Sequence, residues 1–463
     1  MKTFRFTLLA IFALVSNLLV AEAPVGCWKE ISAGDAHTLA IKNDGTLWAW
    51  GRNNKSQMGD GTTVDKNTPT QIGTDTDWAI VSASGMIHSL AIKTNGTLWT
   101  WGDNSNGQLG DGTTLKRNTP VQIGSDTDWS SISGGLYFSV ALKNNGTLWT
   151  WGNNDFAHLG NGTTGGTIYT PQQVGVDTDW SSISSNFDHT IALKSNGTLW
   201  AWGGNNKGQL GDGTTVDKNI PTQIGSATDW SQIAPGGYHS LAVKTDGTLY
   251  TWGLNNGGQL GDGTNSDKLV PTQVGSATDW TGVFAGGWSS FALKTDNNLY
   301  ACGYGSSGQI GNGTNSNCVT FTAVNSSSNM QKVAAGTRHV GAILTDGSLL
   351  MWGYNSTGQL GDGTLVDKNV PTAIACPTSI TTGIAEKSQV NALSIYPNPA
   401  SDILNFAYSF TSVIIYNANG QALKSVQTPN NQLNISDLCA GAYYVKATLQ
   451  NGENATHKLI IKK

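Results

Sequence analysis

A unit of 50 to 51 residues recurs seven times between residues 28 and 376, and this repeat restricts the chain to a few architectures. Each unit carries Trp-Gly at one fixed place, replaced once by Cys-Gly: Trp50-Gly51, Trp101-Gly102, Trp151-Gly152, Trp202-Gly203, Trp252-Gly253, Cys302-Gly303 and Trp352-Gly353. A second large residue opens each unit: Trp28, Trp78, Trp129, Trp180, Trp230, Trp280 and Met330. Periods of this size are typical of solenoids and propellers.

Each unit has the pattern of four short strands. In the first unit these are Trp28–Ala33, His37–Lys42, Thr46–Gly51 and Pro69–Gly73. Asn-Gly or Asp-Gly separates the second strand from the third in most units, which is the signature of a primed hairpin turn. With 58 glycines and 12% charged residues, the composition also favours short strands and tight turns. The sequence therefore predicts an all-β chain with a seven-bladed β-propeller over residues 24–376, and a solenoid as the alternative.

The two ends of the repeat region predict how a propeller would close. In the internal units a turn such as Thr74–Asp77 joins the last strand to the next first strand, but this link is absent at the termini. Cys376 aligns with Thr74 and Cys27 with Asp77. These positions end a four-residue turn, so their Cα atoms would lie within about 7 Å of each other, a separation that suits a disulfide. We expect a Cys27–Cys376 bond that locks the N-terminal strand into the last blade.

The other three cysteines are less constrained. Cys302 and Cys318 fall in the sixth unit, where a second disulfide and two free thiols are equally supported. Cys439 lies beyond the repeats and has no obvious mate.

The N-terminus has the features of a secretory signal over residues 1–23. Lys2 and Arg5 precede an apolar run over 8–20, and Ala21-Glu22-Ala23 offers a cleavage site with small residues. No other stretch is long and apolar enough for a transmembrane segment. We therefore expect an exported protein.

The repeats resemble those of the regulator of chromosome condensation. One example reads His239-Ser240-Leu241-Ala242-Val243-Lys244, then Asp246-Gly247-Thr248-Leu249-Tyr250-Thr251-Trp252-Gly253, then Gly258-Gln259-Leu260-Gly261-Asp262-Gly263-Thr264. The resemblance covers residues 28–376 and implies a seven-bladed propeller closed by strand exchange. It does not imply nucleotide exchange or chromatin binding, because a fold alone does not determine function.

The last 70 residues have a different pattern. Residues 377–391 form a polar linker, and residues 392–463 predict a small β-sandwich. They contain Tyr396-Pro397-Asn398-Pro399-Ala400, then Ile415-Tyr416-Asn417-Ala418-Asn419-Gly420, then a Leu-x-Ala-Gly-x-Tyr stretch at 438–443. These motifs resemble the C-terminal sorting domain of type IX secretion substrates. The resemblance implies that the secretion machinery carries the protein across a Gram-negative outer membrane and removes this domain. The mature protein would then be extracellular, either released or attached to the outer-membrane surface.

No pattern for catalysis, a metal or a cofactor stands out. Five histidines occupy equivalent positions, His37, His88, His189, His239 and His339. A ring with such geometry would hold them too far apart to share one ion, so we favour hydrogen-bonding posts that hold a turn. The Asp-Gly-Thr loops, such as Asp60 to Asp65, could bind calcium, but Asx turns and pairing with neighbouring lysines explain them better. The net charge of −5 and the lack of a Lys/Arg cluster exclude a typical nucleic-acid partner.

The clearest candidate site comes from comparing the seven units with one another. The two residues before the histidine position vary widely, and Phe138 and Ser289 replace the histidine itself. Equivalent loops lie on one rim of a propeller, so these side chains would form one patch rich in types found at binding hot spots. The candidate binding residues are Asp35, Met86, Tyr137, Phe138, Phe187, Asp188, Tyr238, Trp288 and Arg338.

This pattern favours a monomeric, non-enzymatic recognition protein that binds an extracellular protein or glycan through one rim. In an alternative interpretation the large side chains only fill the mouth of the channel, and the protein is a structural or adhesive surface component. A polysaccharide-acting enzyme is less well supported, because the sequence offers no distinctive pair of carboxylates.

Overall fold

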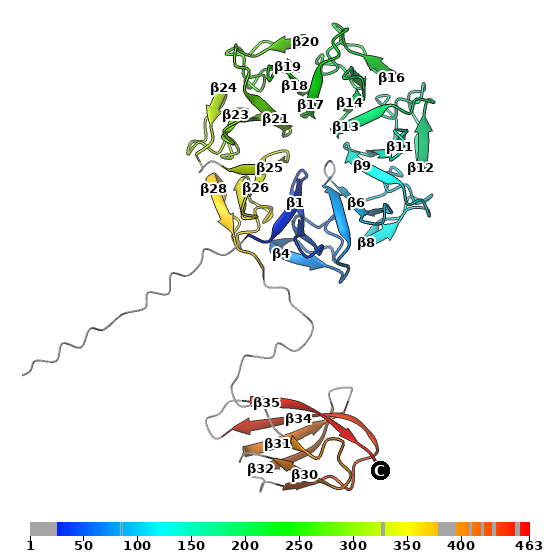
Figure 1. Cartoon of the computed structure of the whole chain (residues 1–463), viewed down its shortest axis with the longest axis vertical. Helices are drawn as coiled ribbons and strands as arrows, with labels where there is room; N and C mark the ends of the chain where they lie inside the picture. The colour runs from blue at the N-terminus through cyan, green and yellow to red at the C-terminus, as the bar shows by residue number, and fades with distance from the viewer. Residues whose placement is uncertain are drawn as a thin grey trace, which may run out of the picture. The chain divides into compact units, whose positions relative to one another are not determined.

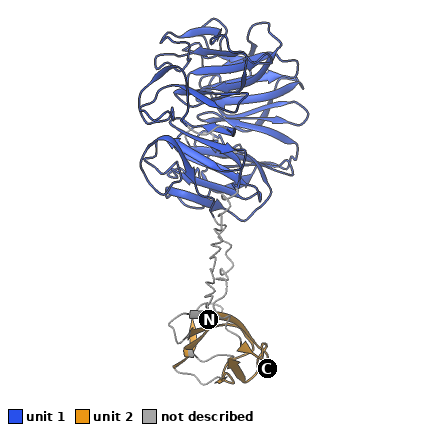
Figure 2. Cartoon of the chain, turned by 60° about the vertical axis from the view of Figure 1, so that its left-hand side comes forward, with its two compact units in different colours: residues 1–377 blue, residues 378–463 orange. Residues whose placement is uncertain are grey.

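The computed structural model describes residues 26–83, 85, 87–325, 329–377, 395–406, 410–417, 421–427, 432–449 and 454–463. The chain divides into two compact units, residues 1–377 and 378–463 (Figure 2). The predicted signal segment, and the predicted linker after Pro377, lie outside the described residues.

The first unit is a ring of seven four-stranded antiparallel sheets (Figure 1), which confirms the all-β propeller. The strands of blades one to four are β1(Trp28–Ala33), β2(His37–Lys42), β3(Leu47–Gly51), β4(Lys66–Ile72); β5(Trp78–Ser82), β6(His88–Lys93), β7(Leu98–Gly102), β8(Arg117–Gln122); β9(Trp129–Gly134), β10(Phe138–Lys143), β11(Leu148–Asn153), β12(Thr167–Val174); β13(Trp180–Asn186), β14(His189–Lys194), β15(Leu199–Gly203), β16(Lys218–Gln223). Blades five to seven contain β17(Trp230–Pro235), β18(His239–Lys244), β19(Leu249–Gly253), β20(Lys268–Gln273); β21(Trp280–Ala285), β22(Ser289–Lys294), β23(Leu299–Gly303), β24(Cys318–Ala323); β25(Met330–Ala335), β26(His339–Leu344), β27(Leu349–Gly353), β28(Lys368–Ile374). The first strand of each blade lies at the centre of the ring.

The hairpin between β2 and β3 differs from the predicted primed turn. Lys42 and Thr46 pair across a three-residue loop, in which the Gly45 N–H donates to the Lys42 carbonyl at 2.9 Å. Gly45 has a φ of +78°, while Asp44 is not among the residues with positive φ. A two-residue type I′ turn would need a positive φ at both residues, and a type II′ turn would need it at Asp44. The loop is therefore the three-residue hairpin with glycine at its left-handed position.

The repeated tryptophans fasten each blade to the one before it. Trp50 is fully buried, and its Nε1–H donates to the Gln359 carbonyl at 2.9 Å. The equivalent bonds run from Trp101 to Gln57, Trp151 to Gln108, Trp202 to His158, Trp252 to Gln209 and Trp352 to Gln309. A buried indole N–H needs an acceptor, and in each of these pairs of blades a backbone carbonyl at the same position of the repeat accepts its hydrogen bond.

The ring closes through a backbone hydrogen bond of the kind found between other blades and through the predicted disulfide. Cys27 and Cys376 are bonded, with their Cα atoms 6.0 Å apart. The backbone N–H of Trp28 donates to the Gly347 carbonyl at 3.0 Å. The backbone N–H of Trp78 donates in the same way to the Gly45 carbonyl at 3.2 Å. The disulfide therefore replaces the missing turn, and this prediction is confirmed.

The expected strand exchange is wrong. Every blade consists of four consecutive strands, so β1 belongs to the first blade and not to the last. The disulfide joins the end of the outer strand β28 to the start of the inner strand β1. With that bond and the blade-to-blade contacts in place, closure needs no strand from the other end of the chain.

A second disulfide is also absent, because Cys302 and Cys318 are both free. Cys302 takes the place of the blade tryptophan and points its Sγ at the Gln259 carbonyl, 3.5 Å away. Cys318 pairs in register with Gly303, the next residue along. The side-chain amide of Asn312 donates to Sγ of Cys318 at 3.5 Å. Burial raises the pKa of the Cys302 thiol well above its usual range.

The second unit is a small β-sandwich, as predicted. Its strands are β29(Ile395–Tyr396), β30(Ile403–Phe406), β31(Phe410–Tyr416), β32(Ala422–Gln427), β33(Gln432–Asn434), β34(Gly441–Leu449) and β35(Asn454–Ile461). One sheet has the order β29-β30-β33 and the other β32-β31-β34-β35. Leu404 and Phe406 from the first sheet share one core with Val413 and Val445 from the second.

Candidate functional site

Two variable positions from each blade meet on one face of the propeller. The residue after each Trp-Gly pair, or after its Cys-Gly equivalent, donates its backbone N–H to a backbone carbonyl. That carbonyl belongs to the residue just before the histidine position, at N···O distances of 2.7 to 3.0 Å. The pairs are Arg52 with Ala36, Asp103 with Ile87, Asn153 with Tyr137, Gly204 with Asp188, Leu254 with Tyr238, Tyr304 with Trp288 and Tyr354 with Arg338. Five second members, Tyr137, Asp188, Tyr238, Trp288 and Arg338, were among the predicted residues, and no first member was. The first could have been found by the same comparison of the units.

Four aromatic rings on this face form a continuous row, which we call the aromatic arc: Phe187, Tyr238, Trp288 and Tyr304. The ring centroids of Phe187 and Tyr238 lie 5.7 Å apart, those of Tyr238 and Trp288 5.8 Å, and those of Trp288 and Tyr304 5.8 Å. All four side chains are half-buried. The arc therefore joins blades four, five and six into one partly exposed surface.

Glycines make room for the two ends of the arc. Phe187 lies in the left-handed region with a φ of +31°, and its ring covers Gly237 and Gly287. A Cβ at Gly237 would come within 2.9 Å of that ring. Tyr304 lies over Gly257, where a Cβ would come within 2.2 Å of its ring. Any side chain at Gly237 or Gly257 would thus displace an arc residue.

Asp188 adds a carboxylate beside the arc. Its Oδ1 lies 3.5 Å from Nε2 of His158. Burial, and then the nearby Asp188 carboxylate, raise the pKa of Tyr238. The Tyr238 hydroxyl is therefore neutral at physiological pH and can donate or accept a hydrogen bond.

The structure separates the remaining predicted residues. Asp35 and Tyr137 are half-buried and Arg338 is exposed on the same face, without ring contacts to the arc. Met86 lies outside the described residues.

Phe138 is not a surface residue, so its place in the predicted patch is wrong. It is fully buried and stacks on His158, with the ring centroids 4.7 Å apart. It occupies the histidine position, which is buried in every blade.

The five repeated histidines connect blades rather than hold a turn. Nε2 of His239 lies 2.9 Å from Oγ of Ser290 in the next blade, and that hydroxyl donates to the Gln259 carbonyl at 2.6 Å. The serine proton is thus committed, so His239 donates from Nε2 and is neutral. Equivalent hydrogen bonds between Nε2 and a hydroxyl join His37 to Ser89, His88 to Ser139, His189 to Ser240 and His339 to Thr38.

Each of these histidines sits at a different blade contact, which leaves no shared position for an ion. Burial, as the largest cause, lowers the pKa of His239 to about 3 and of His88 to about 4. Among the residues that the structure describes, no three His, Cys, Asp or Glu side chains are grouped to hold a metal.

The Asp-Gly-Thr loops are Asx turns, as we favoured. Oδ1 of Asp212 accepts the Thr214 N–H and an Asn205 amide hydrogen, each over 3.0 Å. Its Oδ2 lies 2.9 Å from Nζ of Lys218. The carboxylate oxygens are therefore already paired within the protein.

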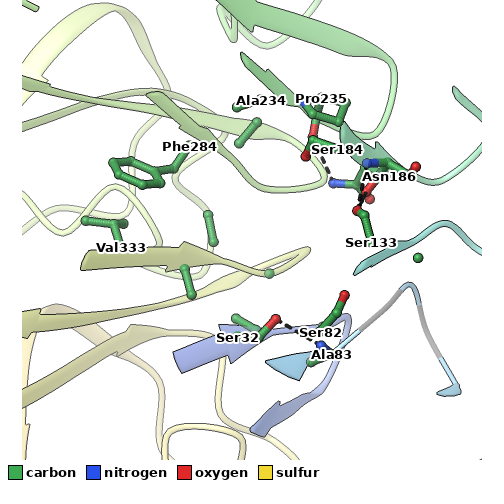
Figure 3. A pocket seen from close by; sticks show the side chains of 18 of the residues that line it. Ser32, Ser82, Ala83, Ser133, Ser184, Asn186, Ala234, Pro235, Phe284 and Val333 are labelled. Atoms are coloured by element: carbon green, nitrogen blue, oxygen red, sulfur yellow. Dashed lines mark hydrogen bonds between the residues drawn. The ribbon is translucent and has the colours of Figure 1, made fainter. Parts of the chain in front are cut away.

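A central cavity lies between the inner strands, with a volume of about 370 Å³ (Figure 3). Blades one to four contribute five serines and Asn186, beside glycines and the apolar Ile31, Ala33 and Ala83, whereas blades five to seven contribute mostly apolar residues, with Gln232 and Thr337 among them. The polar wall includes Ser32, Ser82, Ser133, Ser184, Ser185 and Asn186, and the apolar wall includes Ala234, Pro235, Val283, Phe284, Ala285 and Val333.

Comparison with known families agrees with this architecture. A family model described as RCC1-like domain matches residues 16–283, more than half of the chain. The chain belongs to the RCC1-like domain family. Regulator of chromosome condensation (RCC1) repeats also match residues 296–343 and 346–385 of this RCC1-like chain. A model described as secretion system C-terminal sorting domain matches residues 394–462.

Individual relatives match only parts of the chain. The ultraviolet-B receptor UVR8 of Arabidopsis thaliana is 31% identical over 197 residues, 42% of this chain and 45% of the receptor. The Protein RCC2 homolog of Danio rerio is 45% identical over 78 residues, 17% of this chain and 16% of its own length. The chain thus spans less than half the length of these curated relatives.

Solved structures of other proteins share the fold. Human WBSCR16 has a TM-score of 0.66 at 22% identity, over 72% of this chain and 94% of its own. Prp20p of Saccharomyces cerevisiae has a TM-score of 0.66 at 23% identity, over 73% of this chain and 88% of its own.

The described residues contain no helix long and apolar enough to cross a membrane.

Proposed function

We propose that this RCC1-like protein is a secreted, non-enzymatic recognition protein that binds an extracellular protein or glycan through the face that carries the aromatic arc. The arc itself is the observation that carries the proposal. Its rings come from positions where the blades differ, they contact one another across three blades, and they remain partly exposed. Grouped, partly exposed aromatic residues are typical of binding surfaces.

The match to a secretion system C-terminal sorting domain supports export. Together with the signal-like residues 1–23, it favours type IX secretion, followed by release or attachment at the outer-membrane surface. The bond between Cys27 and Cys376 is compatible with an oxidising compartment.

Two further observations favour binding over the alternatives. None of the four arc side chains lines the central cavity, which favours a role at the surface over filling of the channel. The five repeated histidines, which would be the natural acid-base catalysts, are fully buried and hydrogen-bonded between blades.

The proposal is tested by immobilising the full mature chain and exposing it to glycan panels and extracellular protein extracts. The double variant Tyr238→Ala, Trp288→Ala is compared with Tyr169→Ala, an exposed tyrosine on the outer strand β12. We expect the double variant to lose a ligand that the wild type and Tyr169→Ala both hold. Equal retention by all three folded proteins would contradict the proposal and favour a structural role.

A further inference from the structure

We infer that the ligand is a neutral glycan, which stacks on the aromatic arc and places one sugar residue in the central cavity. This inference rests on the proposed function and narrows it to one chemical class.

The first argument is the charge of the cavity. Its described lining residues include no Asp, Glu, Lys, Arg or His. The ion pair between Glu30 and Lys332 on the inner strands is already formed within the protein. An uncharged lining disfavours an ionic ligand, because a buried charge needs a partner. A volume of about 370 Å³ is at the small end of the range for ligand sites.

The second argument is the division of the cavity into two walls. Figure 3 shows Phe284 and Val333 across the cavity from Ser133 and Asn186. A pyranose ring has the same division, with hydroxyls around its edge and C–H groups on its faces. It could therefore pack its C–H face on Phe284 and direct its hydroxyls to the serines.

The third argument is that hydrogen-bonding capacity remains on the polar wall. Oγ of Ser32 accepts the Ala83 N–H at 2.9 Å, which leaves its own proton available. The Ser184 hydroxyl has no partner among the described residues of the chain. Such hydroxyls can donate to or accept from sugar hydroxyls without a change of protonation.

The fourth argument is continuity between the cavity and the arc. Asn186 lines the cavity, and the next residue, Phe187, begins the arc. Strands β17 and β21 supply much of the apolar wall and lead directly into the loops that carry Tyr238 and Trp288. A short glycan chain could thus pass from the cavity onto the rings, where aromatic faces pack against sugar C–H groups. A protein partner would use the arc but would have no need for a hydroxyl-lined cavity.

The test uses the full mature chain and defined probes. Neutral oligosaccharides of hexoses and N-acetylhexosamines are titrated calorimetrically, with oligogalacturonides as charged comparators. The variants are Trp288→Ala in the arc, Ser184→Leu in the cavity and Tyr169→Ala as the control. Near-ultraviolet circular dichroism checks that each variant is folded.

We expect a neutral oligosaccharide to bind, and Trp288→Ala and Ser184→Leu each to weaken it by about tenfold or more, with no change in Tyr169→Ala. Binding that needs Trp288 but tolerates Ser184→Leu would overturn the placement of a sugar in the cavity. Preference for the charged comparators would overturn the assignment as a neutral glycan. If no glycan binds but an extracellular protein is held in a Trp288-dependent way, the glycan inference fails and the proposed function stands. If neither binds, both fail.

Discussion

At the scale of single residues, neither replacement of the histidine leaves a hydroxyl of the next blade without a hydrogen bond. Where Phe138 replaces the histidine, Thr190 in the next blade bonds to Ser185 instead, at 2.8 Å. Where Ser289 replaces it, the next blade has Val340, which carries no hydroxyl. The physical reason is that a buried donor without an acceptor lowers the free energy of unfolding more than replacement of both partners by other groups does.

This pairing makes a quantitative prediction. Ser290→Ala would leave the buried Nε2–H of His239 without its acceptor, so we expect the free energy of unfolding to fall by about 1–3 kcal/mol. Urea denaturation measures the change, with the exposed Ser306→Ala as control. Equal stability of the two variants would show that the bond contributes nothing.

The same histidines predict a pH dependence. Burial is the main cause that lowers the pKa of His37, His239 and His339 to about 3 and of His88 and His189 to about 4, from 6.5. Below pH 6.5 the unfolded chain therefore binds more protons than the folded chain. The stabilisation is complete above pH 6.5 and is lost as the pH falls toward the folded values, by up to about 1.4 kcal/mol per pH unit for each histidine. Urea midpoints that stay constant from about pH 7 to about pH 4.5 would contradict this account.

Internal comparison of the repeats could predict most of the candidate site at this scale, but not which side chains are exposed. Tyr238 and Trp288 follow from variability alone. Phe138 varies as well, yet it is buried, because its position faces the neighbouring blade. Tyr304 was missed although its position also varies, because its contact with Trp288 depends on backbone pairing between two loops.

At the scale of strands and turns, the sequence predicts the inner strands of a blade more closely than the outer one, where predicted Pro69–Gly73 is observed as Lys66–Ile72. The boundaries Trp28–Ala33 and His37–Lys42 agree with β1 and β2. The hairpin type does not follow from the sequence, because Asn-Gly and Asp-Gly suit both a two-residue primed turn and the three-residue loop found here. Only the pairing of Lys42 with Thr46 distinguishes them.

The disulfide belongs to this scale as well. The bond joins residues 349 positions apart, and the chain-entropy model assigns about 6 kcal/mol to closing such a loop. We expect the double variant Cys27→Ser, Cys376→Ser to melt at a lower temperature, with early loss of amide protection in β1 and β28. The double variant Cys318→Ser, Cys439→Ser removes two free thiols and is the matched control. Equal melting temperatures would contradict a role in closure.

At the scale of the whole molecule, closure and the aromatic arc arise from contacts between distant repeats. The sequence predicts seven blades because each unit repeats the same local pattern. It could not exclude strand exchange, because that depends on how the first and last blades meet in space. The sequence likewise places Phe187, Tyr238 and Trp288 of the arc 50 to 51 positions apart, and only the ring brings them into contact.

The most direct test of the central claim is hydrogen–deuterium exchange on the full mature chain, alone and saturated with whichever panel member it retains. The account predicts protection in residues 186–188, 237–238, 287–288 and 304–306, which carry or adjoin the aromatic arc. Protection confined to the opposite face, at the turns such as residues 43–45, would contradict it.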